Sequence, residues 1–159
     1  KIDVGAFIGG YHGDSANTFP VGHVSEEALR LIEATKRSFE LGVEAASQPG
    51  ARLGDVGAAI DGYVTKMGYS TVKKFVGHGI GQDLHEDPNV PNYGIKGTGP
   101  LLKEGMVIAI EPMLNLGQED IVIDDNDWTI STLDGKPSAH FEHTVLVTKD
   151  GYQILTTGE

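Results

Sequence analysis

The feature of this sequence that most constrains its fold is the placement of its carboxylates, several of which lie within or beside segments typical of buried strands. Asp3 lies inside the first strand-like run. Glu111 directly follows the apolar run 107–110, and Glu142 precedes the strand-like run 144–147. An ionised carboxylate in a buried strand is costly unless a positive charge compensates it. One such residue is usually paired or lies at a strand end, but several together, with few basic residues nearby, indicate bound cations.

A predicted hairpin near the start of the chain shows how two of these acids could meet. Two extended runs, 2–8 and 11–21, flank the dipeptide Gly9-Gly10, which favours a two-residue turn. In that register the residue numbers of each cross-strand pair sum to 19, so Asp3 pairs with Ala16. Asp14, two residues before Ala16, then lies on the same face as Asp3 at a diagonal distance of roughly 7–8 Å. A three-residue turn would place the two acids on opposite faces.

Two histidines extend this candidate site. His78 lies between two glycines where a strand gives way to a loop, so its ring and the nearby backbone have room to approach a ligand. His85, seven residues further on, could line the same cavity. The acidic ligand candidates carry enough negative charge to balance two divalent cations; they are Asp3, Asp14, Glu111 and Glu142. Oxygen-rich sites with one imidazole suit Mn, Fe(II), Co or Zn, and a pair of such ions supports hydrolysis of an amide or a phosphate ester.

The remaining pattern predicts an α+β fold in which helices cover one face of a largely antiparallel sheet. Ser25 is a typical N-cap residue for a helix that ends at Pro49-Gly50, and a second helix is predicted over 53–67. We expect a long glycine-rich loop over 77–100. Later strands are predicted at 71–76, 106–116, 121–123, 128–132, 141–148 and 152–155. No linker divides the chain, so residues 1–159 read as one catalytic domain segment.

Composition excludes several classes of protein. The 12 Lys+Arg and 23 Asp+Glu give a formal net charge of −11, and the absence of a basic cluster argues against binding to nucleic acid. No apolar run approaches the roughly 20 residues that a membrane helix needs. The chain contains no cysteine, which excludes a disulfide framework, a Cys-ligated zinc and a thiol nucleophile.

Several short segments together resemble type I methionine aminopeptidases, and the resemblance extends along the whole chain. The order Asp, Asp, His, Glu, Glu among the ligand candidates is a specific signal, whereas the glycine-rich segment 77–81 is shared with related enzymes. The segments that carry the resemblance are 2–4, 12–14, 77–81, 85–86, 105–112 and 141–144. It implies the pita-bread fold, a pseudo-twofold α+β arrangement around a dinuclear metal centre.

The resemblance also implies a role for each ligand candidate. Asp3 would chelate one metal ion, while Asp14 and Glu142 would bridge both ions. His78 and Glu111 would complete the coordination of the second ion. The cofactors would be two divalent ions, either Co, Mn, Fe(II) or Zn.

Three residues have implied roles in catalysis or substrate binding. Glu111 would handle the proton of the attacking hydroxide, and His85 would form a hydrogen bond with the substrate backbone near the scissile bond. Trp128 would lie near the mouth of a methionine pocket. The implied activity is removal of N-terminal methionine from nascent proteins and peptides by a cytoplasmic monomer, with the ribosome as a candidate partner and no direct binding to nucleic acid or membranes.

Two alternative functions stay open within the same fold. The first is an Xaa-Pro aminopeptidase or prolidase-like enzyme, but such chains typically carry an Arg and an Asp around the last metal-binding glutamate, where this sequence has Phe141-Glu142-His143. The second is a non-catalytic pita-bread module that binds peptides, although such modules lose metal ligands and all five are present here.

A family member should also have an N-terminal part before Asp3 that contributes further helices, strands and pocket residues. If residues 1–159 were the whole molecule, we would expect an exposed apolar surface, an unpaired sheet edge and poor activity.

Overall fold

A seven-stranded antiparallel sheet forms the centre of the computed structural model, which describes residues 1–157. Its strands are β1 (Ile2–Ile8), β2 (Tyr11–Asn17), β4 (Gly77–Gly79), β5 (Glu86–Val90), β6 (Val107–Ile110), β11 (Glu142–Thr148) and β12 (Gly151–Ile154). They follow the spatial order β1-β2-β11-β6-β4-β5, with β12 paired to β11. Strands that are distant in the sequence, such as β2 and β11, are therefore neighbours in the sheet.

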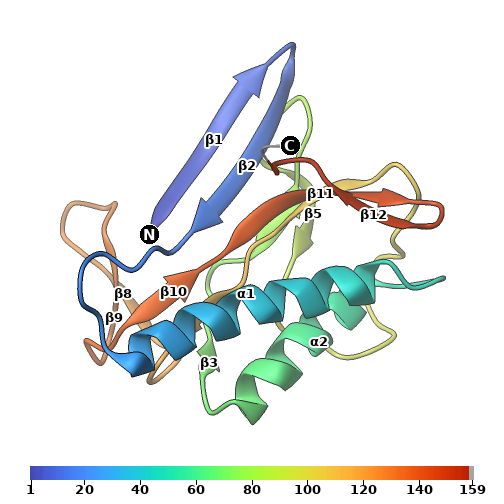
Figure 1. Cartoon of the computed structure of the whole chain (residues 1–159). Helices are drawn as coiled ribbons and strands as arrows, with labels where there is room; N and C mark the ends of the chain where they lie inside the picture. The colour runs from blue at the N-terminus through green and yellow to red at the C-terminus, as the bar shows by residue number, and fades with distance from the viewer. Residues whose placement is uncertain (158–159) are drawn as a thin grey trace.

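Two smaller sheets and two helices complete the fold. The smaller strands are β3 (Ser70–Thr71), β7 (Met113–Asn115) and β10 (Ser138–His140) in one sheet, and β8 (Ile121–Ile123) and β9 (Ile130–Thr132) in the other. The helices α1 (Glu26–Ala46) and α2 (Leu53–Lys66) lie together on one side of the strands, as Figure 1 shows. The predicted α+β layout, with helices on one face of an antiparallel sheet, is confirmed.

The register of the first hairpin is the one that the Gly9-Gly10 turn predicts. Gly5 pairs with Asp14 and Asp3 pairs with Ala16. Both turn glycines have positive φ angles, 61° and 91°, which two-residue hairpin turns of the primed type require. Asp3 and Asp14 therefore do lie on the same face of the β1–β2 hairpin.

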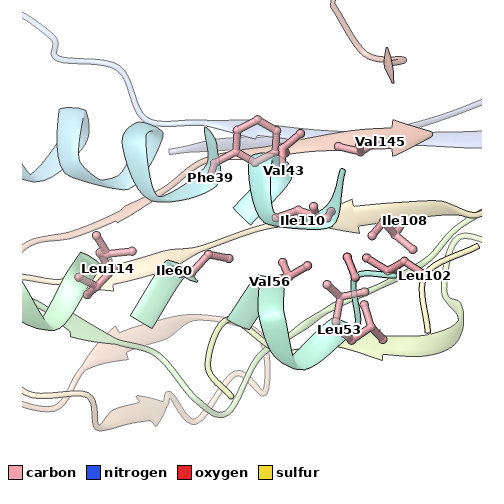
Figure 2. Packing of buried hydrophobic residues seen from close by; sticks show 14 of the residues in the cluster. Phe39, Val43, Leu53, Val56, Ile60, Leu102, Ile108, Ile110, Leu114 and Val145 are labelled. Carbon is pink, nitrogen blue, oxygen red and sulfur yellow. The ribbon is translucent and has the colours of Figure 1, made fainter. Parts of the chain in front are cut away.

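The hydrophobic core lies between the helices and the central sheet. The helix α1 begins after Ser25, whose side-chain oxygen accepts a hydrogen bond from the backbone N–H of Ala28. Apolar side chains of both helices pack against β6 and β11 (Figure 2). The labelled core residues of these elements are Phe39, Val43, Leu53, Val56, Ile60, Ile108, Ile110 and Val145. Burial of these side chains fixes the helices on one face and leaves the opposite side of the sheet available for polar chemistry.

The sequence predicted the middle of the chain less well. The expected strand 71–76 is limited to β3, and the expected loop 77–100 contains β4 and β5. These two strands were missed because glycine in β4 and Asp, Pro and Asn in β5 are residue types that are depleted in strands. The expected strand 106–116 divides into β6 and β7 at Glu111-Pro112, since proline has no N–H to donate to a sheet. The strand β10 was not predicted.

The outer strand β1 is exposed along its whole length. It pairs with β2 and forms one edge of the central sheet, and its apolar residues Ile2, Val4 and Phe7 are 58%, 54% and 63% exposed. The exposed apolar surface and the unpaired edge expected for residues 1–159 alone are thus both present. Among the described residues, no helix combines the length and apolar character needed to cross a membrane.

Two glycines of α2 give a test of this packing. A methyl group at Gly57 would overlap the backbone carbonyl of Tyr93, whereas one at Gly62 would meet no atom within 4 Å. We expect Gly57→Ala to lower the free energy of unfolding by about 1–3 kcal/mol, and Gly62→Ala to raise it by about 0.5–1 kcal/mol through the better helix propensity of alanine. Urea denaturation measures both changes, and changes of equal sign would contradict this packing.

Candidate metal centre

The five predicted ligand residues lie on, or directly after, five neighbouring strands of the central sheet. Asp3 and Asp14 lie on β1 and β2, Glu142 begins β11, Glu111 follows β6, and His78 is the central residue of β4. These strands are neighbours in the order β1-β2-β11-β6-β4, so segments up to 139 residues apart in the sequence meet at one place.

Strand register explains why the carboxylates converge. Ala16 pairs with Asp3 on one side and with Glu142 on the other, so the three residues form one row across β1, β2 and β11. Residues at i and i+2 of a strand point to the same face, which adds Asp14 to the face that carries this row. The β6–β11 register, in which His143 faces Ile110, brings the next residue along, Glu111, beside Glu142.

One group of potential ligands contains Asp14, His78 and Glu142. All three are buried, and each offers a ligand atom within 4.8 Å of the others. The Nδ1 atom of His78 lies 2.8 Å from the carbonyl oxygen of Gly79. A hydrogen on Nδ1 therefore donates to that carbonyl and leaves Nε2, which faces the carboxylates, free to bind a cation.

A second group contains Glu111, His140 and again Glu142, and it is also fully buried. The Nε2 atom of His140 lies 3.5 Å from Oε2 of Glu111. Sequence analysis did not identify His140. It could have been found because it lies two residues before Glu142, and alternate residues of an extended segment share a face.

Asp3 lies at the edge of this arrangement. Its side chain is 57% exposed, and its Oδ2 atom lies 3.9 Å from Nδ1 of His140. It belongs to neither of the two groups just described. The structure therefore brings Asp14, His78, Glu111 and Glu142 into close contact and places Asp3 beside them on the solvent side.

The electrostatics of the site favour the binding of positive charge. Burial, followed by the nearby charges of Glu111, Asp14 and Asp3, raises the pKa of Glu142 to about 9. Burial and the charge of Asp3 also raise the pKa of Asp14. Within residues 1–157, no lysine or arginine forms an ion pair with these acids, and the only basic side chains within 4 Å of any of them are the imidazoles of His78 and His140.

Unsatisfied polar atoms support the same interpretation. Oδ1 of Asp14, Nε2 of His140 and Oε1 of Glu142 are buried without a hydrogen-bond partner. Buried polar atoms are rarely left unpaired, and those that are require an explanation. Divalent cations bound by oxygen and imidazole ligands would satisfy these atoms and offset the negative charge. The residues present therefore fit a centre of two divalent ions.

Thr144 fixes the position of one bridging candidate. Its hydroxyl accepts a hydrogen bond from the backbone N–H of Asp14 and donates one to the carbonyl oxygen of the same residue, each at 2.9 Å. This pair of bonds ties β2 to β11 next to Glu142. The Asp14 and Glu142 carboxylates are thus held by the sheet and not by a flexible loop.

The site opens into a cavity of about 1060 Å³ that holds the two remaining predicted residues. His85 lines it and packs edge-on against His78, with 4.4 Å between ring centroids. Trp128, on the segment between β8 and β9, also lines the cavity but is 86% exposed, so it lies on an open side. Apolar wall residues such as Met113 and Ile121 accompany the polar ones. This cavity can accept a ligand with both polar and apolar parts.

Comparison with known proteins identifies the family to which this chain belongs. Residues 1–149 match the model of metallopeptidase family M24, and the chain belongs to this family. It is 50% identical over 156 residues to methionine aminopeptidase 1 of Bacillus subtilis and 51% identical over 159 residues to methionine aminopeptidase of Clostridium acetobutylicum. The matches cover 98% and 100% of this chain but 62% and 63% of those proteins. The chain thus spans less than two thirds of the length of these relatives.

Solved structures confirm the predicted pita-bread fold. Methionine aminopeptidase from Rickettsia prowazekii superimposes with a TM-score of 0.94 at 44% identity, over 98% of this chain and 62% of that one. Prolidase from Pyrococcus furiosus superimposes with a TM-score of 0.76 at 28% identity, over 99% of this chain and 40% of that one. The predicted resemblance to methionine aminopeptidases is therefore confirmed, and the chain is more similar to this methionine aminopeptidase than to this prolidase.

The raised pKa of Glu142 predicts how the metal-free chain responds to pH. Between its ordinary value near 4.5 and about 9, the folded chain retains a proton that the unfolded chain releases. Folding then binds a proton, so the free energy of unfolding should fall as the pH rises from about 7 to about 9. Thermal denaturation in the presence of a chelator measures this trend.

Glu142→Gln supplies the control for that measurement, because the amide cannot release a proton. We expect the variant to lose most of the fall in melting temperature over the same pH interval. Parallel pH profiles for the two proteins would contradict the assignment of the raised pKa to Glu142.

Proposed function

We propose that the protein carrying this chain is a metal-dependent aminopeptidase that removes N-terminal methionine from nascent proteins and peptides. The observation that supports this most strongly is the pair of buried ligand groups that share Glu142, because a shared carboxylate is the arrangement that two neighbouring ions need. Membership of the M24 family and the similarity to methionine aminopeptidases support the same activity.

We assign the metal ligands as Asp3, Asp14, His78, Glu111 and Glu142. Asp14 and Glu142 would bridge the ions, His78 and Glu111 would complete one ion, and Asp3 would chelate the other. The donor set accepts Co, Mn, Fe(II) or Zn. When bound, such a pair lowers the pKa of water and so supplies a hydroxide nucleophile at neutral pH.

The side chains beside the ligand groups have roles of their own. Glu111 is the proposed proton carrier, since its two carboxylate oxygens face different imidazoles, Oε1 at 3.6 Å from His78 and Oε2 at 3.5 Å from His140. It would take a proton from the nucleophile and deliver it to the leaving amine. His85, which packs against His78 on the cavity side, would donate a hydrogen bond to the substrate backbone.

Substrate selection is assigned to the cavity wall. Trp128 would lie near the mouth of the methionine pocket, and the apolar side chains beside it suit an unbranched thioether side chain. The proposed substrate also indicates where the enzyme acts, since N-terminal methionine is present on newly made chains. We therefore place the enzyme in the cytoplasm as a monomer, with nascent chains at the ribosome as its substrates.

Metal removal tests the proposed activity. In the complete enzyme, a chelator should abolish methionine release from a Met-Ala-Ser peptide, and added Mn²⁺, Co²⁺ or Fe²⁺ should restore it. Glu142→Ala should lose at least about 100-fold in turnover even with added metal, because both ligand groups lose their shared carboxylate. The matched control Glu104→Ala, an exposed glutamate in a turn, should behave as the unmodified protein does. Full activity of folded enzyme after complete chelation would contradict the proposal.

His85 provides a separate test of substrate binding. We expect His85→Ala to reduce kcat/KM by about tenfold to a hundredfold, the cost of one hydrogen bond to a charged or polarised group, while metal content stays unchanged. Peptide hydrolysis and elemental analysis of the same sample give the two values. The exposed loop residue His23 offers the control His23→Ala, and a loss of metal in His85→Ala would show that the ring acts on the metal centre instead.

A further inference from the structure

We propose that His140 is an additional ligand of the metal centre, whose Nε2 atom binds the ion that Asp3 would chelate and that Glu142 shares. Each of the two ions would then carry one imidazole, His78 on one side and His140 on the other. This inference deepens the proposed function and rests on its dinuclear centre. It assigns a ligand beyond the five that the sequence predicts.

The first support is the symmetry of the ligand groups. The site contains two trios of buried ligand atoms, each with one histidine, and Glu142 belongs to both. Glu111 lies between the two rings, with similar distances of 3.6 Å to Nε2 of His78 and 3.5 Å to Nε2 of His140. His140 therefore has the same relation to the shared carboxylates as His78, which was expected to bind metal from the sequence alone.

The second support is the unsatisfied nitrogen. The His140 side chain is 8% exposed, and its Nε2 atom has no hydrogen-bond partner. Its other nitrogen, Nδ1, faces Oδ2 of Asp3 at 3.9 Å. When Nε2 binds an ion, the hydrogen of the imidazole lies on Nδ1, where the carboxylate of Asp3 is placed to attract it.

The third support is the way in which the backbone of His140 is held. The hydroxyl of Thr18 accepts a hydrogen bond from the His140 N–H and donates one to the His140 carbonyl oxygen, each at 2.9 Å. On its other side, His140 pairs with Met113 of β7. Thr18 directly follows β2, the strand of Asp14, so the ring of His140 is placed relative to the other ligands before any ion binds.

The direct test is magnetic coupling between a bound metal and a histidine nitrogen. The full chain, with nitrogen-15-labelled histidines, is loaded with cadmium-113 ions, and NMR reports which ring nitrogens show one-bond coupling to cadmium. We expect coupling at Nε2 of both His78 and His140, and none at His23. The measurement uses the unmodified protein, so it does not depend on a variant that folds.

Metal affinity provides the second measurement. In calorimetric titration with Zn²⁺, His140→Gln should weaken one of the two binding events at least about tenfold, a minimum for loss of a group that contacts the ion, and leave the other unchanged. The control His23→Gln should leave both events unchanged. Equal affinities for His140→Gln and the unmodified protein would overturn the inference.

The outcomes separate this inference from the proposed function. Coupling at His78 without coupling at His140, in protein that holds two cadmium ions, would overturn the role of His140 and leave the aminopeptidase proposal intact. Failure to bind two ions, or no coupling at His78, would contradict both proposals together.

Discussion

The central sheet holds several carboxylates close together against their mutual repulsion, and the rest of the structure depends on this arrangement. Backbone pairing places Asp3 and Glu142 on either side of Ala16, and the double hydrogen bond from Thr144 holds Asp14 beside them. Hydrogen bonding and the core beneath the helices provide the energy that keeps these like charges close. The fold therefore maintains a concentrated negative site that suits the binding of divalent cations.

The sequence predicted those features of the fold and site that neighbouring residues determine, and it missed those that depend on contacts between distant segments. The turn at Gly9-Gly10 determined the register of its hairpin, so the relation between Asp3 and Asp14 followed from the sequence and was confirmed. The contribution of His140 depends on β10 lying between β7 and the end of β2, an arrangement that no local pattern encodes. The strands β4 and β5 were missed for a similar reason, since their residue types do not signal a strand and their backbones pair because the fold brings them together.

The similarity to methionine aminopeptidases and the geometry of the site support one another in different ways. Similarity identifies family and fold, whereas the buried and unsatisfied polar atoms of Asp14, His140 and Glu142 support the proposal that these residues bind metal. The relatives are longer than this chain, and here the strand β1 exposes apolar side chains along the sheet edge next to Asp3. Asp3 is exposed to solvent at this same edge, while the other proposed ligands are buried.

The protonated state of Glu142 at neutral pH has a consequence for how the site fills. A carboxylic acid must be ionised before it can bind a metal, so loading exchanges a hydrogen ion for each such group that becomes a ligand. Metal uptake is thus a competition between two kinds of cation for the same oxygen atoms. A lower pH favours binding of the hydrogen ion. The fraction of molecules that hold metal therefore depends on the pH as well as on the metal concentration.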